Sequence, residues 1–148
     1  PLWLIQCISI YITSWLKRTR MFKLGANSLN NRAGVDPRLI EIDDRAIQIT
    51  VIDYGHPSSG GLRTTEDQAA LYTAGKSMAD GRTNKSYHQT GRALDVYAYV
   101  DGKASWEAEH LAMIAVAYMQ AANELGYKLT WGGLWTGFSD MPHFQLGE

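Results

Sequence analysis

Apolar residues recur at helical spacing in the stretch that follows residue 36. The positions three or four residues apart are Leu39, Ile42, Ala46 and Ile49. This spacing predicts an amphipathic helix, with Asp36 as its N-cap and Pro37 at its first position. The folded domain is expected to begin near Asp36, because the Gly-, Ser- and Asn-rich residues 25–34 are typical of an irregular lead-in.

A longer apolar stripe predicts a second helix over residues 105–125. Its members are Leu111, Ile114, Tyr118, Ala121 and Leu125. Ser105 is placed to cap this helix and Gly126 to end it. Glu107 and Glu109 in the first turn suit the positive end of the helix dipole. This is the strongest helix signal in the chain.

Alternation of apolar and polar residues predicts strands elsewhere. Residues 92–97 alternate in this way, which places Asp95 on the face away from the apolar side chains. Residues 143–146 likewise place His143 on the opposite face from its apolar neighbours. Residues 127–131 are expected to form a third strand, joined to the last one by a Gly- and Trp-rich loop.

Shorter signals fill the rest of the chain. Thr65 and Gln68 have the spacing of a capping box, so a short helix is expected from Thr65 to a stop at Gly75. Residues 50–52 are a short β-branched run before a loop rich in Gly, Pro and Ser. Helices combined with hairpin-like strands indicate an α+β domain, with a small antiparallel sheet packed with helices.

The composition suits one globular domain, which we assign to residues 21–148 of the 148. Fourteen Lys and Arg against 15 Asp and Glu give a net charge of -1, so no nucleic-acid partner is expected. We expect a monomer. The single cysteine, Cys7, excludes an intrachain disulfide and a Cys-based zinc site or nucleophile in the core. Histidines and carboxylates remain as candidate metal ligands.

Residues 1–20 form an N-terminal extension in which an apolar run precedes a basic cluster. A signal peptide has these features in the opposite order. The run is also shorter than the roughly 20 residues of a membrane span. The favoured interpretation is upstream read-through sequence, with Met21 as the natural start. The alternative is a membrane anchor, and only in that case would the protein contact a membrane.

Two polar segments contain the residues of a metal site. A turn lets His88 and Asp95 fold back toward each other, and Asp140 precedes His143 by three residues. A catalytic zinc ion usually has three protein ligands drawn from His and carboxylates, and it keeps one position open for water. If both segments line one cleft, His88, Asp95 and His143 can bind one Zn²⁺.

Other polar and aromatic residues fit around such a site. Asp140 remains as a carboxylate that can accept a proton from metal-activated water. Arg63 can stabilise a developing oxyanion or bind a substrate carboxylate, and the spacing does not choose between these roles. Trp131 and Trp135 are either core residues or a wall of the substrate site. Ser86 is expected to make a supporting hydrogen bond and not to act as a nucleophile.

These segments resemble the zinc peptidases that include VanY-like D-Ala-D-Ala carboxypeptidases and the L-alanyl-D-glutamate endopeptidases of phage endolysins. The family element Ser-x-His-x-x-Gly-x-Ala-x-Asp is complete at residues 86–95. The second element is present as Trp-Gly-Gly-x-Trp at residues 131–135, which leads into Asp-Met-Pro-His-Phe at residues 140–144. An upstream Gly-x-Arg-Thr segment contributes Arg63, and Gln68 follows it as in many relatives.

The resemblance covers roughly residues 21–148 and implies a hedgehog/DD-peptidase-like fold. It implies that His88, Asp95 and His143 bind one zinc ion and that Asp140, where some members carry Glu, is the catalytic base. The implied reaction is hydrolysis of a peptide bond in the peptidoglycan stem peptide. The L-Ala-D-Glu bond is favoured over the D-Ala-D-Ala bond because the domain is short.

Alternatives from other classes stay open. A non-catalytic zinc-binding module needs the three ligands but has no use for Asp140 or Arg63. A cell-wall binding domain would show repeats or an aromatic-rich second module, which the sequence lacks. His56 and His110 are interpreted as structural residues. Action on the cell wall, in the periplasm or outside the cell, would need holin-type release or an N-terminal anchor, since no cleavable signal peptide is seen.

Overall fold

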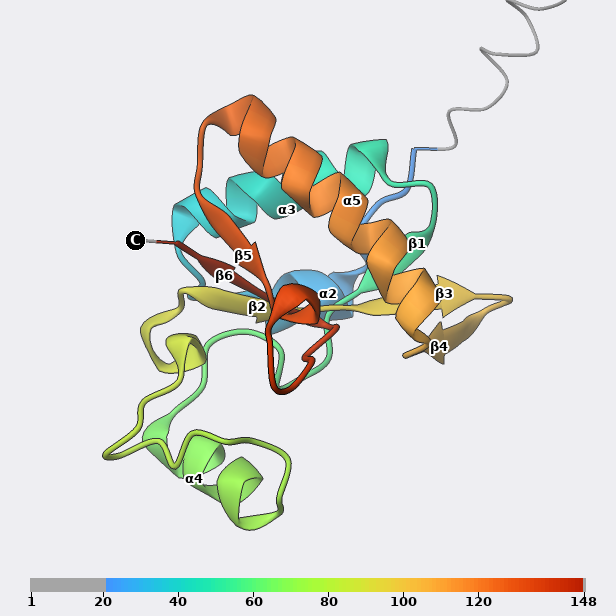
Figure 1. The fold of residues 1–148 in the computed structure, drawn as a ribbon. Helices are drawn as coiled ribbons and strands as arrows, with labels where there is room; N and C mark the ends of the chain where they lie inside the picture. Colours follow the sequence, from blue (N-terminus) through green and yellow to red (C-terminus); the bar gives the residue numbers. More distant parts are fainter. Residues whose placement is uncertain (1–20, 148) are drawn as a thin grey trace, which may run out of the picture.

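Two three-stranded antiparallel sheets and two long packed helices dominate the computed structural model, which describes residues 21–147 (Figure 1). The strand orders are β1-β3-β4 and β2-β6-β5. This confirms the α+β class, with the antiparallel strands divided between two sheets. The elements in chain order are α2 (Ala26–Asn31), α3 (Pro37–Ile49), β1 (Asp53–Gly55), α4 (Thr65–Thr73), η1 (Tyr87–Thr90), β2 (Ala93–Asp95), β3 (Tyr97–Val100), β4 (Lys103–Ser105), α5 (Ala108–Leu125), β5 (Leu129–Trp131), η2 (Gly132–Leu134) and β6 (His143–Leu146).

Helix α3 begins and ends where the sequence predicts. Asp36 caps it by accepting a hydrogen bond from the Arg38 backbone N–H at 3.0 Å, and Pro37 occupies the first position. Pro suits that position because its missing N–H would have no helical partner there. Helix α5 ends as predicted at Gly126, which has the left-handed φ of 75° that favours glycine.

The start of α5 differs from the prediction by three residues. The helix begins at Ala108, and its N-cap Glu107 makes no side-chain capping bond. Ser105 is the last residue of β4, where it pairs with Ala98 of β3. The Ser105 hydroxyl contacts His110 Nδ1 at 2.8 Å, so His110 has the structural role expected of it.

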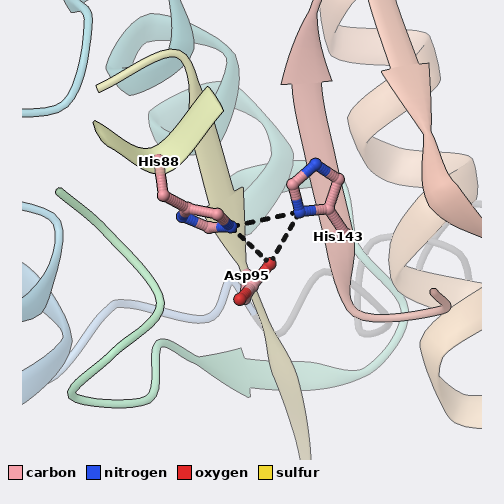
Figure 2. A group of neighbouring side chains, drawn as sticks. All are labelled: His88, Asp95 and His143. Carbon is pink, nitrogen blue, oxygen red and sulfur yellow. Dashed lines mark hydrogen bonds and ion pairs between the residues drawn. The ribbon is translucent and has the colours of Figure 1, made fainter. Parts of the chain in front are cut away.

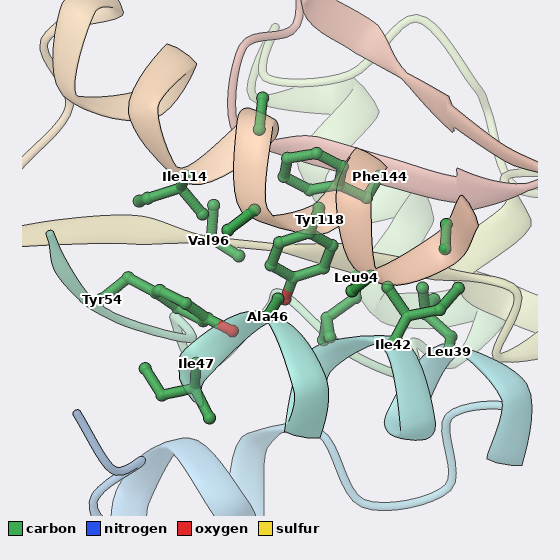
Figure 3. Close-up of a cluster of buried hydrophobic side chains, with 14 of the residues drawn as sticks. Leu39, Ile42, Ala46, Ile47, Tyr54, Leu94, Val96, Ile114, Tyr118 and Phe144 are labelled. Atoms are coloured by element: carbon green, nitrogen blue, oxygen red, sulfur yellow. The ribbon is translucent and has the colours of Figure 1, made fainter. Parts of the chain in front are cut away.

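The core lies between α3, α5 and the inner faces of the strands (Figure 3). Tyr118 of α5 stacks on Phe144 of β6 with ring centroids 4.2 Å apart. Both predicted stripes are largely buried, but Leu125 at the end of α5 is 39% exposed, contrary to the prediction. This core attaches α3 and α5 to the sheet that contains β2 and β6.

The second sheet places two predicted site residues side by side. Strand β6 lies between β2 and β5, and Asp95 is the register partner of His143 while Leu94 is the partner of Phe144. Side chains alternate between the faces of a sheet, so Leu94 and Phe144 enter the core together. Asp95 and His143 therefore share the opposite face.

Two local predictions were wrong in detail, and strand β1 was not predicted. Residues 26–31 form helix α2 where an irregular lead-in was expected, so the folded part begins before Asp36. The β-branched run at residues 50–52 precedes the strand, which is Asp53–Gly55. The capping box of α4 is formed by Thr64 and Asp67, one residue before the predicted pair.

Residues 1–20 lie outside the described part of the chain. The structure therefore does not test whether they are upstream read-through sequence or a membrane anchor. The boundary of the domain at residue 21 therefore stays a prediction. Between residues 21 and 147, none of the helices is both long and apolar enough to span a membrane.

Candidate metal site

Three side chains converge in the way the sequence predicts for metal ligands (Figure 2). His88 Nε2 lies 3.1 Å from His143 Nδ1, and His143 Nδ1 lies 3.1 Å from Asp95 Oδ1. The third edge, from His88 Nε2 to Asp95 Oδ1, is 3.2 Å. Two histidines and a carboxylate from three separate segments thus present one atom each to a common point.

His88 is placed by the short helix η1. The Ser86 hydroxyl caps this helix by accepting from the His88 backbone N–H at 3.3 Å, and the Gln89 side chain accepts from the Ser86 N–H at 3.0 Å. Gly91 ends the helix at φ 68°, and a Cβ there would lie 2.7 Å from the carbonyl oxygen of Gly34. Ser86 therefore makes a supporting bond, as expected, and Gly91 is required by both φ and space.

The hydrogen bonds on the far sides of the two rings orient the ligand nitrogens. His88 Nδ1 donates to the Gly61 carbonyl at 2.9 Å, which turns Nε2 toward the other two ligands. His143 Nε2 lies 3.0 Å from Gln145 Oε1, which turns Nδ1 toward them. Gln145 was not singled out in the sequence, although its place two residues after His143 on the same strand face was visible.

This arrangement fits a bound cation. Two ring nitrogens and a carboxylate oxygen that face one another repel unless a proton or a metal cation lies between them. Three ligands of a tetrahedral zinc ion, at roughly 2.0–2.1 Å from it, lie about 3.3–3.4 Å apart. The separations of 3.1 to 3.2 Å are close to that spacing. His88, Asp95 and His143 can therefore bind a metal ion.

Arg63 binds the second oxygen of Asp95. Its Nη2 donates to Asp95 Oδ2 at 2.7 Å, its Nη1 to Gln68 Oε1 at 3.2 Å and its Nε to the Ser59 carbonyl at 2.6 Å. These bonds fix the guanidinium beside the metal site and direct Asp95 Oδ1 toward the histidines. Gln68, fully buried, holds Arg63 in turn.

The electrostatics of the cluster favour ionised Asp95. Burial opposes its ionisation, but the nearby His88 and His143 outweigh burial and lower the pKa of Asp95 far below its usual range. Burial would also lower the pKa of His143, yet its hydrogen bond to Asp95 raises that pKa above the ordinary value. The carboxylate is thus available as a ligand at neutral pH.

Asp140 lies beside the three candidate ligands but outside their group. Burial, and next the negative charge of Asp95, raise the pKa of Asp140 above its ordinary value. Its backbone is fixed by bonds to Gly132 and His143, each of 3.1 Å. Its carboxylate makes no hydrogen bond or ion pair with any residue in 21–147, so it faces the cleft with both oxygens available.

The four residues line one cleft with a volume of about 810 Å³. Trp135 is part of its wall and lies against His143, with ring centroids 5.1 Å apart. Trp131 instead stacks with Phe144 in the core and donates from Nε1 to the Met141 carbonyl at 2.7 Å. Trp131 is thus a core residue, whereas Trp135 lines the cleft and its contact with a substrate stays a prediction.

A buried network behind the site was not predicted. His56 lies between Asp43, whose Oδ2 is 3.0 Å from Nε2, and the Asp95 carbonyl oxygen, 3.0 Å from Nδ1. Both partners are acceptors, so both ring nitrogens donate and the ring is a buried cation. Asp43 Oδ1 also accepts from the hydroxyls of Tyr54 and Tyr118, at 2.8 and 2.5 Å.

The network supports the strand that carries Asp95. His56 is structural, as expected, and it lies buried directly after β1. The signal for Asp43 was present in the sequence, because it falls four residues after Leu39, within the apolar stripe of α3. A carboxylate there must be buried, and a buried carboxylate needs partners.

Comparisons with known proteins agree with this geometry. Residues 20–145 match the model of the phage L-alanyl-D-glutamate peptidase family. The chain is 34% identical over 120 residues to the L-alanyl-D-glutamate peptidase of Escherichia phage T5, which covers 80% of this chain and 85% of the relative. It is 37% identical over 85 residues to the L-alanyl-D-glutamate peptidase of Listeria phage A118, which covers 57% of this chain and 28% of the relative.

A solved structure is also similar. The crystal structure of the Serratia marcescens L-Ala D-Glu endopeptidase ChiX superposes with a TM-score of 0.74 at 37% sequence identity. The match covers 84% of this chain and 90% of that protein.

Proposed function

This chain belongs to the phage L-alanyl-D-glutamate peptidase family, and from that premise we propose that it hydrolyses the L-Ala-D-Glu bond of peptidoglycan stem peptides. The observation that carries the proposal is the cleft itself. Three convergent metal ligands and one unpartnered carboxylate, Asp140, open onto the same space. A structural metal site is usually closed by four protein ligands, whereas a catalytic one leaves a position for water.

We propose zinc as the metal, held by His88, Asp95 and His143. Two imidazoles and one carboxylate are a ligand set that zinc accepts in hydrolases. Held by these three residues, a zinc ion would supply polarisation of the scissile carbonyl and a lowered pKa of its bound water.

Asp140 acts as the general base and then as the general acid. Its carboxylate takes the proton of the attacking water and returns it to the amine that leaves when the amide bond breaks. The raised pKa of Asp140, caused by burial and by Asp95, makes its carboxylate a stronger base, so it takes the proton of the attacking water more readily. A module without catalysis would not need this carboxylate.

Arg63 is proposed as a positioning residue that acts through Asp95. The sequence suggested direct contact with an oxyanion or a substrate carboxylate, but three bonds now direct the guanidinium at Asp95, Gln68 and the Ser59 carbonyl. These bonds use three of its five N–H groups. The other two can still donate hydrogen bonds to a substrate. The main effect of Arg63 is to neutralise and orient Asp95, one of the three proposed zinc ligands.

The place of action and the partner belong to the same proposal: the protein acts on the cell wall, and the stem peptide is its partner. A monomer without a nucleic-acid partner stays a prediction from the sequence. The names of the relatives specify the L-Ala-D-Glu bond, which favours the endopeptidase over the D-Ala-D-Ala carboxypeptidase.

The test compares zinc-loaded wild type with Asp140→Asn on purified peptidoglycan, with fragment masses read by mass spectrometry. The variant should keep its zinc and lose about 10²- to 10⁴-fold in kcat. Glu66→Gln, an exposed acidic residue of α4 outside the cleft, serves as the matched control. If wild type binds zinc and cuts no stem peptide, the non-catalytic module is the better account. If Asp140→Asn remains fully active, another group is the base.

A further inference from the structure

The cleft has an aromatic rim that the proposed chemistry does not use. Trp106, directly after β4, and Phe138, after η2, both line the cleft, although they are 53% and 52% exposed. Phe138 packs on Trp135 at 5.3 Å between ring centroids. Large aromatic side chains left open to water beside a site suggest a surface that a ligand covers.

The rim continues outward along β3. Trp106 packs against Tyr97 with centroids 5.7 Å apart, and Tyr97 packs against Tyr99 at 5.6 Å. Tyr99 is 44% exposed. We call Trp106, Tyr97 and Tyr99 the aromatic ledge. It leads from the cleft, through Trp106, onto the surface of the first sheet.

The opposite side of the cleft has a different chemistry. Residues of α4 and of the segment after it line this side, among them the polar Lys76, Ser77 and Asn84 and the apolar Leu71 and Met78. Lys76 forms no ion pair with a carboxylate in residues 21–147. In Figure 1, α4 and the β3–β4 hairpin lie far apart, on either side of β2, which carries Asp95. The candidate metal ligands thus lie between the side that carries Lys76 and the aromatic side.

The substrate has the same asymmetry, provided that the proposed function is right. In a stem peptide, L-Ala is joined by an amide to the lactyl group of N-acetylmuramic acid, so a sugar ring lies one residue before the scissile bond. D-Glu, after the bond, carries a free carboxyl group. The free carboxylate suits the side of Lys76. The sugar must then lie on the side of Trp106.

We propose that the aromatic ledge binds the muramyl sugar of the glycan strand, with Trp106 stacked on the sugar ring. The C–H face of a pyranose packs well on a flat aromatic ring, and rigid Trp and Tyr side chains lose little entropy on binding. The cleft volume of about 810 Å³ lies in the range for ligand sites of drug size, so it has room beyond the two residues of the scissile bond. The enzyme therefore selects glycan-linked peptide over free peptide.

The test measures kcat/KM on two substrates with the same peptide, one linked to N-acetylmuramic acid and one capped with a lactyl group alone. Wild type should prefer the muramyl substrate, and Trp106→Ala should lose about tenfold on that substrate only. Trp106→Phe should keep part of the preference. Tyr72→Ala is the matched control, since Tyr72 is 50% exposed on α4 but does not line the cleft.

The outcomes separate this inference from the proposed function. Equal rates of wild type on both substrates, or an equal loss by Trp106→Ala on both, overturn the sugar site while the peptidase stands. If neither substrate is cut by the zinc-loaded protein, the proposed function fails, and the sugar site fails with it. Zinc content and circular dichroism of each variant establish that it is folded, and Tyr99→Ala tests the ledge independently.

Discussion

Asp43 is expected to contribute far more stability than its neighbour Asp44, although both pair with Arg32 at 2.7 Å. The Asp43 side chain is fully buried, whereas that of Asp44 is 55% exposed. In Asp43→Asn, an oxygen can still accept from Tyr118, but an NH₂ group then faces the donors of His56 and Arg32. Breaking a buried pair in this way costs about 3–5 kcal/mol. Asp44→Asn breaks an exposed pair and should cost less than about 1 kcal/mol.

Urea denaturation of the two variants, followed by circular dichroism, measures this difference directly. A loss of about 3–5 kcal/mol is a large share of the roughly 5–15 kcal/mol by which a domain is stable, so Asp43→Asn should unfold at much lower urea. Equal losses in the two variants, or a loss below about 1 kcal/mol in Asp43→Asn, would refute the argument that burial makes the Asp43 network important.

Two further predictions concern the rings that flank Asp95. Gln145→Leu removes the acceptor on His143 Nε2 and should weaken zinc binding about 10- to 100-fold with the fold intact; chelator competition measures this, and an unchanged affinity would show that Gln145 does not orient the ring. The pKa of His56 is raised because Asp43 outweighs the opposing effect of burial. The stability from this pair is fully present below the ordinary His pKa of about 6.5 and is lost as pH rises through the raised value. The urea midpoint of wild type should therefore fall on the alkaline side, and His56→Asn, less stable at every pH, should lack that slope.

The sequence predicted those helices and strands whose bounds depend on a local pattern of apolar and polar residues. Strand β6 and helix α3 have their predicted bounds, because alternation and helical spacing are read within a few residues. The start of α5 was wrong because Ser105 pairs with Ala98 across a hairpin, and tertiary pairing outweighs a local capping signal. Helix α2 was missed since its polar sequence has no apolar stripe. It is attached instead through Ser28 and Asn31, whose side chains bind the backbone of His56.

The candidate site also has one part that the sequence predicted and one part that it did not. The approach of His88, Asp95 and His143 was predicted from complete motifs, and the structure brings them together. The partners of His56 were not predictable, because Asp43 and Asp95 are 13 and 39 residues away from it in the chain. A pattern identifies a residue type at a position, but it does not identify which distant backbone will lie against it.

The pairing of Asp95 with His143 across β2 and β6 has a consequence for how this protein matures. A slip of one residue between these strands would turn His143 into the core and expose Phe144 to the cleft. The group of candidate metal ligands and the aromatic core thus need the same alignment, and a misaligned chain can form neither. A metal ion bound by His88, Asp95 and His143 would therefore stabilise only the correctly aligned strands.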